Sequence, residues 1–309
     1  MIDEPLAKVA LAISAFRSDQ AVSQMLETAF AQGPPGFGAV IVVDSLGSGA
    51  IARLVERNGW PVHYINSDGN LGSAGNLDLR LRTAADLGLE WCLALNHDGE
   101  LDLGKVRRLV EHGRANRRAG VIYPQLVFSS AGGRRDSPRR TFSTYGMLDR
   151  GDDEREADSC LEVAWGSSNG ALYRLDAIRS GVSAWPELWM GYEDLAIGWE
   201  LKRQGWLQLL CTDVEVIDNY EYAPVRLLGR EVYLATKPSW YTYYHVRNQL
   251  LIARGTGGTA VGWASIFARA IVDVALILLF RDRKGERLRL LVRGAVDGLK
   301  GRSGKGPVP

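Results

Sequence analysis

The sequence predicts an α/β fold with a mostly parallel central sheet flanked by helices. Short apolar runs over 9–14, 39–43, 61–65 and 91–95 are typical of strands that are covered on both faces. Segments with apolar residues at helical spacing separate these runs. Such strand–helix–strand alternation favours parallel pairing with right-handed crossovers.

The composition is that of an ordinary globular protein. The 309 residues suffice for one large α/β domain with an appendage, and 46% are hydrophobic. A net charge of +1 gives no overall attraction for nucleic acid. The isolated cysteines, Cys92, Cys160 and Cys211, lack metal-binding spacing, and their odd number argues against a disulfide framework. We therefore expect buried thiols in a reducing cytosol, and the N-terminus shows no signal-peptide pattern.

Polar residues follow the first two strands. The first apolar run ends in Ala15, Phe16 and Arg17, after which a capped helix is expected. The second run ends in the carboxylate of Asp44, and a further helix begins after Gly47. Polar groups at these strand ends would meet at one edge of a parallel sheet.

A glycine-rich loop over 66–76 follows the third strand and leads into a helix. Small residues let the backbone approach a ligand closely, and a helix N-terminus favours anions. A plain strand-to-helix turn is the alternative interpretation. The loop lacks the GxGxxG pattern and follows the third strand rather than the first, which disfavours a dinucleotide-binding Rossmann fold.

The fourth apolar run stops abruptly at Asn96-His97-Asp98. The alternation of an extended backbone places the side chains of Asn96 and Asp98 on the same side. Carboxylate and amide oxygens suit a hard divalent cation, which could hold a diphosphate at the carboxyl end of the strand. A turn or helix cap is the alternative interpretation of this tripeptide.

The middle of the chain is less regular. We expect a helix with a basic outer face over 101–118 and a strand over 121–124. The basic segment 129–140 is expected to be a mobile loop, and the acidic run 149–158 to be exposed. Small polar residues interrupt a predicted strand pair over 163–174, where a substrate could lie against the backbone.

A second acidic pair, Glu193 and Asp194, opens an amphipathic helix that ends at Gly205. Acidic residues in a first turn stabilise the helix dipole, or they can serve as a general base at a pocket rim. Neighbouring aromatic residues favour a pocket on which a sugar stacks. These are Trp185, Trp189 and Tyr192.

Taken in order, these motifs resemble those of the family 2 inverting glycosyltransferases with the GT-A fold, most of all the rhamnosyltransferase and galactofuranosyltransferase types. The resemblance covers about residues 8–254 and rests on the segments 15–17, 42–45, 70–76, 95–98 and 191–205. It implies a GT-A catalytic domain over 1–235 and a helical region over 236–309. It also implies sugar transfer from a UDP- or dTDP-linked donor to a glycan or polyprenyl-linked acceptor in cell-wall polysaccharide biosynthesis.

The resemblance implies a role for individual residues. Asp194 would be the catalytic base, with Glu193 orienting it or the acceptor. Asp98 would bind Mg²⁺ or Mn²⁺ on the diphosphate with His245 as a further ligand, although His245 could equally be an ordinary helix-surface histidine. Nucleotide-sugar contacts would come from Ala15, Phe16, Arg17, Asp44, Asn70, Gly72, Asn76, Asn96 and Arg247. Acceptor contacts would come from Trp165, Gly166, Ser167, Trp189 and Tyr192.

Three positions depart from the family pattern. Asn96 replaces the first carboxylate of the usual Asp-x-Asp and removes one negative charge. Ala196 and Glu200 stand where an Asp and an Arg often face the site. These departures motivate one alternative, a catalytically silent nucleotide-sugar-binding or scaffold protein. A nucleotidyltransferase on a related sheet is the other.

The C-terminal region has a different pattern. The run 261–280 is strongly apolar, but Arg269 and Asp273 interrupt it on one helical face. Basic and apolar residues alternate over 281–293, which favours a helix in the headgroup plane of an anionic leaflet, with the protein peripheral at the cytoplasmic face. Packing on the catalytic domain and a homodimer interface are the alternatives. The tail 301–309 is expected to be disordered.

Overall fold

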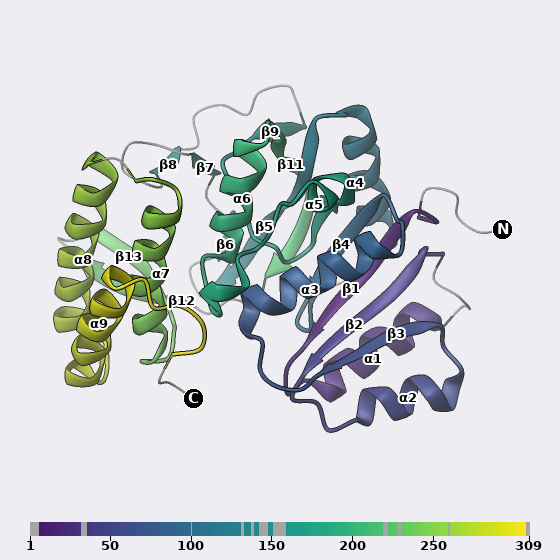
Figure 1. Ribbon diagram of the computed structural model, residues 1–309, viewed down its shortest axis with the longest axis horizontal. Coiled ribbons are helices and arrows are strands. Elements are labelled where there is room, and N and C mark those ends of the chain that lie inside the picture. The colour runs from purple at the N-terminus through teal and green to yellow at the C-terminus, as the bar shows by residue number, and fades with distance from the viewer. Residues whose placement is uncertain are drawn as a thin grey trace.

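The computed structural model describes residues 6–31, 36–99, 101–130, 133–136, 139–141, 148–150, 159–218, 222–227, 230–258 and 260–306. Within these residues a mixed sheet of nine strands lies between two layers of helices, and three further helices lie together at one end (Figure 1). The predicted α/β fold with a helical C-terminal part is confirmed.

The first four strands are parallel, as predicted. β1 lies between β2 and β4, and β3 follows β2. Their bounds are Val9–Ala15 for β1, Ala39–Ser45 for β2, Val62–Ser67 for β3 and Trp91–Asn96 for β4. The helices between them are α1 (Asp19–Phe30), α2 (Ala50–Asn58) and α3 (Gly72–Asp86). All four strands therefore end at one edge of the sheet.

Both faces of this sheet are covered, which explains the continuous apolar runs. Along β1, Leu11 and Ile13 pack with α1, α2 and α4 (Leu103–Ala115). The alternate residues Ala10 and Ala12 pack with α3, α5 (Leu175–Arg179) and α6 (Glu193–Arg203). Neither face of the strand is left for polar side chains, so polar residues appear only where a strand ends.

The second half of the sheet corrects the predicted strand pair over 163–174. β10 (Ala171–Arg174) lies antiparallel between β4 and β5 (Ala119–Ser130), whereas β9 (Cys160–Glu162) pairs with β11 (Leu207–Asp218) at the sheet edge. The strands on either side of the small polar residues thus have different partners. The segment between them is a connection across the sheet.

Short strands extend the second half. The segment 129–140, predicted as a loop, contains β6 (Gly133–Asp136), which pairs with β5, and the start of β7 (Arg139–Thr141). β7 pairs with β8 (Leu148–Arg150), and most of the acidic run, 151–158, lies outside the described residues. The remaining elements are β12 (Tyr222–Leu227), β13 (Arg230–Ala235) and the 3₁₀ helix η1 (Pro186–Leu188).

A disulfide between Cys160 and Cys211 contradicts the predicted thiols, whereas Cys92 is buried and free as expected. The two bonded residues are 51 positions apart in the chain and face each other across the antiparallel pair of β9 and β11. A count of cysteines carries no information about such a cross-strand pairing.

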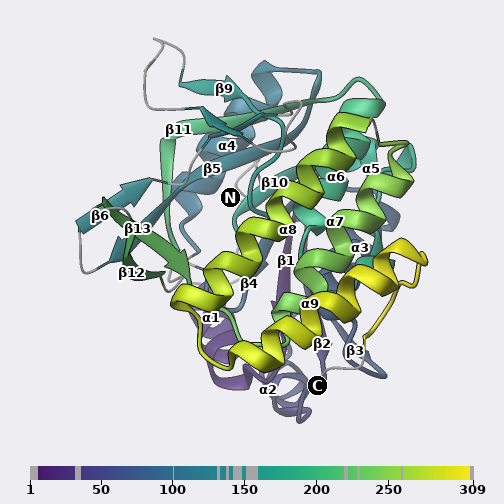
Figure 2. The same cartoon turned by 90° about the vertical axis from the view of Figure 1, so that its left-hand side faces the viewer.

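The C-terminal helices are α7 (Tyr241–Gly255), α8 (Ala260–Phe280) and α9 (Lys284–Leu299), which lie beside one another (Figure 2). The segment Gly262–Phe280 has a mean hydropathy of 2.0, and within the described residues it alone is long and apolar enough to cross a membrane.

The tail after α9 is ordered up to residue 306, contrary to expectation. The Gly304 amide donates to the carbonyl of Glu187, and the Gly306 amide donates to the Tyr244 hydroxyl at 2.8 Å. Backbone hydrogen bonds to both η1 and α7 hold the tail in place. The domain boundary at residue 235 stays a prediction.

Candidate active site

The ends of β1, β2 and β4 bring the predicted nucleotide-binding residues to one edge. Ala15 pairs with Asp44, and Ser14 pairs with Asn96, so these strands end level with one another. Phe16 and Arg17 are exposed beyond β1, and Arg17 has a left-handed backbone with φ of 52°. The turn therefore leaves the sheet with its side chains open to solvent.

Asp44 is an almost fully buried carboxylate at this edge. Its Oδ2 accepts a hydrogen bond of 2.8 Å from the Tyr64 hydroxyl, and its buried Oδ1 has no hydrogen-bond partner within the described residues. Burial raises the pKa of Asp44, although the hydrogen bond from Tyr64 opposes the shift. An orphaned buried acceptor fits a ligand that donates a hydroxyl or amide proton there.

The loop before α3 is tied to the segment that precedes α6. Asn70 Oδ1 accepts from the Gly72 amide at 2.9 Å, and the Asn70 carbonyl accepts from the Trp189 indole at 3.0 Å. Gly72 has a φ of +67°, and a Cβ there would collide with the Trp189 carbonyl. Asn76 is buried and donates to the Val43 carbonyl at 3.1 Å, so it joins α3 to β2.

Arg80 is a buried cation that sequence reasoning missed. Its guanidinium is 2% exposed and donates to the carbonyls of Ala12 and Leu95, at 3.0 Å each. Burial lowers the pKa of Arg80 to about 10, against the opposing charges of Glu193 and Asp194. The signal in the sequence was a charged residue within the helical spacing of Leu77, Leu81 and Ala84, which are buried in α3.

The turn that precedes β10 joins the end of β4, where the metal site is predicted, to Asp194, the predicted base. Asn169 is buried, and its Oδ1 accepts a hydrogen bond of 3.1 Å from the amide of Asn96 at the end of β4. The neighbouring amide of Ser168 donates to Asp194 Oδ1 at 3.1 Å. Asp98 is exposed two residues beyond Asn96. One short turn therefore places the end of β4 beside the N-terminus of α6.

Glu193 and Asp194 lie in the first turn of α6, but their environments differ. Glu193 is 9% exposed, and burial raises its pKa against hydrogen bonds from Ser73 and the backbone. Asp194 is half-buried and faces the Ser168 amide. Gly191 has a φ of +79°, and a side chain there would meet the Tyr241 hydroxyl, which explains the glycine before this acidic pair.

The aromatic residues predicted to contact an acceptor are mostly internal. Trp165 and Trp189 are 9% and 5% exposed, and Trp189 stacks on Tyr244 with ring centroids 4.8 Å apart. Their indoles fill the protein's own packing, so the predicted stacking on an acceptor is wrong for these two rings. Tyr192 is half-buried at the start of α6.

The 166–169 turn that precedes β10 is held by contacts within the protein. Gly166 lies against the ring of Tyr123, where a Cβ would collide, and the Ser167 hydroxyl accepts from the Asn169 amide at 3.3 Å. Close packing and internal hydrogen bonds therefore fix the backbone that holds Ser168 and Asn169.

Two residues of α7 with predicted roles at the site make contacts inside the protein. Arg247 is fully buried and donates to the carbonyls of Leu188 and Gly304, at 2.7 Å and 2.6 Å, so it cannot contact a diphosphate. His245 contacts the Tyr192 hydroxyl through Nδ1 at 3.0 Å and Asp273 through Nε2 at 3.1 Å. Both of its ring nitrogens have protein partners, and its metal-ligand role stays a prediction.

The donor set at the end of β4 fits a divalent cation that is shared with a ligand. Asp98 supplies one exposed carboxylate and Asn96 one amide oxygen. Mg²⁺ is commonly bound by one or two carboxylates together with substrate phosphates. Within the described residues, the one cluster of three or more potential metal ligands lies elsewhere, around Asp213.

The mixed sheet between two helical layers, with polar groups at the ends of its parallel strands, is the architecture of the GT-A class of nucleotide-sugar transferases. The sequence profile of glycosyl transferase family 2 matches residues 11–179. The chain therefore belongs to glycosyl transferase family 2, and it is a glycosyltransferase. No curated protein sequence matches it.

Solved structures share the fold at low identity. Residues 1–349 of S. aureus TarS superpose with a TM-score of 0.59 and 12% identity, over 94% of this chain and 80% of that one. GalNAc-T7 with UDP, GalNAc and Mn²⁺ gives 0.59 and 12%, over 82% of this chain and 48% of that one. The mannosyltransferase PcManGT from Pyrobaculum calidifontis, with GDP-Man and Mn²⁺, gives 0.53 and 14%, over 94% and 87%. This chain thus spans about half the length of GalNAc-T7.

Proposed function

We propose that this chain is an inverting glycosyltransferase that moves a sugar from a nucleoside diphosphate to an acceptor hydroxyl. The observation that carries the proposal is the 168–169 turn, which bonds to Asp194 on one side and to the end of β4 on the other. A base and a diphosphate site must lie this close, because the attacking oxygen and the leaving group share one anomeric carbon.

Asp194 is the proposed general base. Its carboxylate takes the proton of the acceptor hydroxyl as that oxygen attacks the anomeric carbon and the nucleoside diphosphate leaves. The Ser168 amide and the N-terminus of α6 stabilise the charged form of Asp194, as a base requires before the reaction. A single displacement inverts the anomeric centre without a covalent intermediate.

Glu193 is the proposed positioning residue of the pair. Burial raises the pKa of Glu193 and favours its protonated form, and a carboxyl group that already holds a proton cannot take one from the acceptor. The hydroxyl of Ser73 interacts with Glu193 and also accepts from the Gly191 amide at 3.2 Å. Glu193 therefore fixes the start of α6 against α3, and so it sets the direction of Asp194.

On the β4 side of the 168–169 turn, Asp98 and Asn96 would hold Mg²⁺ or Mn²⁺, which neutralises the negative charge of the leaving diphosphate when bound. Two structures of similar fold, GalNAc-T7 and PcManGT, contain Mn²⁺. PcManGT also contains GDP-Man, and residues 1–349 of S. aureus TarS have been solved with UDP-GlcNAc. Asp44 would accept from the nucleoside through its orphaned Oδ1. We further propose a rhamnose- or galactofuranose-like sugar, from the resemblance of the motifs.

The decisive test of the base is Asp194→Asn. Loss of a general base costs about 10²–10⁴-fold in rate, whereas donor affinity should stay near that of the wild type. Donor binding is measured calorimetrically, and the products by NMR. Release of nucleoside diphosphate with an inverted anomeric centre supports the proposal. Release of inorganic diphosphate would indicate nucleotidyl transfer, and donor binding without turnover in the wild type would indicate a silent binding protein.

A second proposal concerns α8, which presents an apolar stripe to solvent. Its exposed apolar positions recur at helical spacing along the helix, with the exposed Arg269 among them. They are Ala264, Phe267, Ala268, Ile271, Val272, Ala275, Leu278 and Leu279. The neighbouring face of α9 exposes basic and apolar residues together, among them Arg289, Val292 and Arg293. We infer that this combined surface docks on an anionic leaflet at the cytoplasmic face, where a polyprenyl-linked acceptor would be anchored.

Two charged residues of α8 and α9 have internal roles. Arg287 is 5% exposed and donates to the Lys237 carbonyl at 2.9 Å, and Asp273 binds His245. They secure α9 and α8 to the rest of the chain, which leaves the stripe itself for a partner.

Sedimentation with anionic liposomes tests the docking. Ile271→Asp should release the protein from vesicles, whereas Leu87→Asp, at an exposed leucine of the catalytic domain, should not. Unchanged sedimentation of Ile271→Asp would contradict membrane docking. A concentration-dependent dimer that dissociates in Ile271→Asp would assign the stripe to a second copy of the chain.

A further inference from the structure

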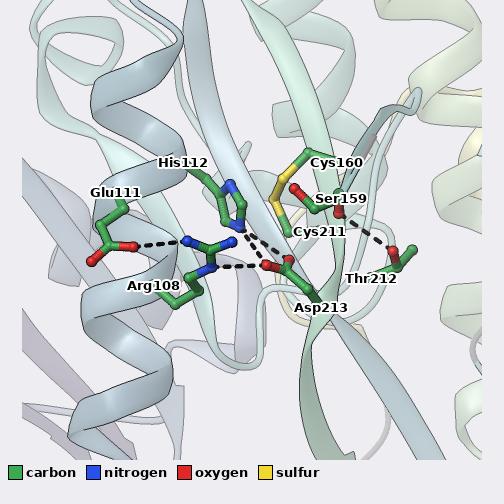
Figure 3. The surroundings of a disulfide bond; sticks show 8 residues. All are labelled: Arg108, Glu111, His112, Ser159, Cys160, Cys211, Thr212 and Asp213. Carbon is green, nitrogen blue, oxygen red and sulfur yellow. Dashed lines mark hydrogen bonds and ion pairs between the residues drawn. A yellow bond between two sulfur atoms is a disulfide. The ribbon is translucent and has the colours of Figure 1, made fainter. Parts of the chain in front are cut away.

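A cluster of potential metal ligands surrounds the disulfide, apart from the candidate active-site residues. Figure 3 shows His112 from α4 directed toward the disulfide and toward Asp213 of β11. One ligand atom from each of His112, Cys160, Cys211 and Asp213 lies within 4.8 Å of all the others. Two sulfurs, one imidazole and one carboxylate are a ligand set typical of zinc.

The backbone holds the two sulfurs together without help from their covalent bond. Cys160 and Cys211 are paired across β9 and β11, and the pairing continues through Leu161 and Leu210. The Thr212 amide donates to the Ser159 carbonyl at 2.8 Å on the other side of the disulfide. Breaking the disulfide would therefore leave both thiols facing each other, because the ladder on either side remains.

The two other ligands are already oriented. His112 Nε2 lies 2.9 Å and 3.0 Å from the oxygens of Asp213. Arg108 Nε donates to Asp213 Oδ2 at 2.8 Å, and Glu111 accepts from the same guanidinium at 3.0 Å. Outer contacts of this kind fix the direction of metal-binding carboxylates. The positive charge of Arg108 also offsets the net charge of two thiolates, one carboxylate and Zn²⁺.

We propose that Cys160, Cys211, His112 and Asp213 form a zinc site when the disulfide is reduced. A dithiol reductant gives up two electrons and two protons to the disulfide, becomes a disulfide itself and leaves two cysteine thiols. Binding of Zn²⁺ then displaces the two thiol protons and forms two zinc–sulfur bonds. Four protein ligands leave no open position, which makes the site structural rather than catalytic.

The site lies where it would hold the edge strand β9 in the sheet. β9 is the last strand of the sheet, and it leads directly into the turn that holds Ser168 and Asn169. The disulfide in the oxidised chain, and zinc in the reduced chain, would each fasten this edge strand to β11, and zinc would add α4. β9 would thus stay paired with β11 in either redox state.

Metal analysis of the full chain tests the proposal without any need for transferase activity. The chain is incubated with Zn²⁺ after reduction by a phosphine or after oxidation, and it is then desalted. We expect about one zinc ion per reduced chain and none per oxidised chain. Replacement by Co²⁺ should produce a thiolate-to-cobalt charge-transfer band. Equal zinc in both forms, or none in the reduced form, would overturn the proposal.

Variants assign the ligands. His112→Ala should weaken zinc binding to the reduced chain at least about tenfold, whereas His63→Ala, at an exposed histidine of β3, should not. Cys160→Ser should abolish the cobalt band, and Cys92→Ala should keep it. If Cys160→Ser fails to fold, His112→Ala decides, because it leaves both cysteines in place. Zinc binding of wild-type strength in His112→Ala would overturn the assignment.

Discussion

Asn169→Ala is the substitution that most directly tests how the fold positions the proposed base. Asn169 is 4% exposed, and its Oδ1 is the acceptor for the Asn96 amide at 3.1 Å. Alanine leaves this amide without its acceptor, which costs about 1–3 kcal/mol in the free energy of unfolding. The turn also loses its attachment to β4, so the Ser168 amide should shift relative to Asp194.

A displacement of about 1 Å at reacting groups can reduce the rate about 10²-fold. We therefore expect a lower kcat for Asn169→Ala, with the dissociation constant for the donor changed little. Denaturant unfolding measures the stability, and steady-state kinetics well below the melting temperature measure kcat. Asn58→Ala is the matched control, because it removes a side-chain hydrogen bond of 2.9 Å to a helix carbonyl far from the site. A folded Asn169→Ala with the kcat of the wild type would refute the reasoning.

Three further predictions follow from the site. The pKa of the Glu193 carboxyl is raised above 4.5, so this group binds more protons in the folded chain than in the unfolded chain. The free energy of unfolding should therefore fall as pH rises from 4.5 through the pKa of the folded chain. Denaturant unfolding measures this dependence on pH, and Glu193→Gln should remove the part that comes from this carboxyl. Arg247→Met should lower the free energy of unfolding by about 3 kcal/mol, because the Gly304 carbonyl and the buried Asn248 Oδ1 lose the donors that Arg247 supplies. The folded variant should bind donor normally, and a selective loss of donor affinity would restore the diphosphate role. Chelation should reduce the transfer rate of the wild type, and Asp98→Ala should abolish the response to added Mn²⁺; an unchanged response would exclude Asp98 as a ligand.

Local pattern was enough to predict the four parallel strands, the helices between them and the polar residues at the ends of these strands. Continuous apolar runs indicated burial on both faces of the sheet, and the polar residues at the ends of these runs indicated where each strand stops. Asn96 and the acidic pair at 193–194 were found in this way, since each interrupts a clear pattern.

Pairing across the chain was decided only by the tertiary structure. The 51-residue separation of Cys160 and Cys211 closes because β11 places β9 at the sheet edge, and no local pattern encodes that neighbour. Arg247 looked like a ligand contact because its sequence neighbourhood matched a motif, yet α7 buries it against η1.

Asn169, in contrast to Arg247, has a role at the site that its sequence neighbourhood did not indicate. In the sequence it is one of several small polar residues in a connection, but sheet order places it between β4 and α6. Periodicity within one element determines which side chains are buried. The order of strands in the sheet determines which buried groups meet, because hydrogen bonds and disulfides depend on distance in space and not on separation along the chain.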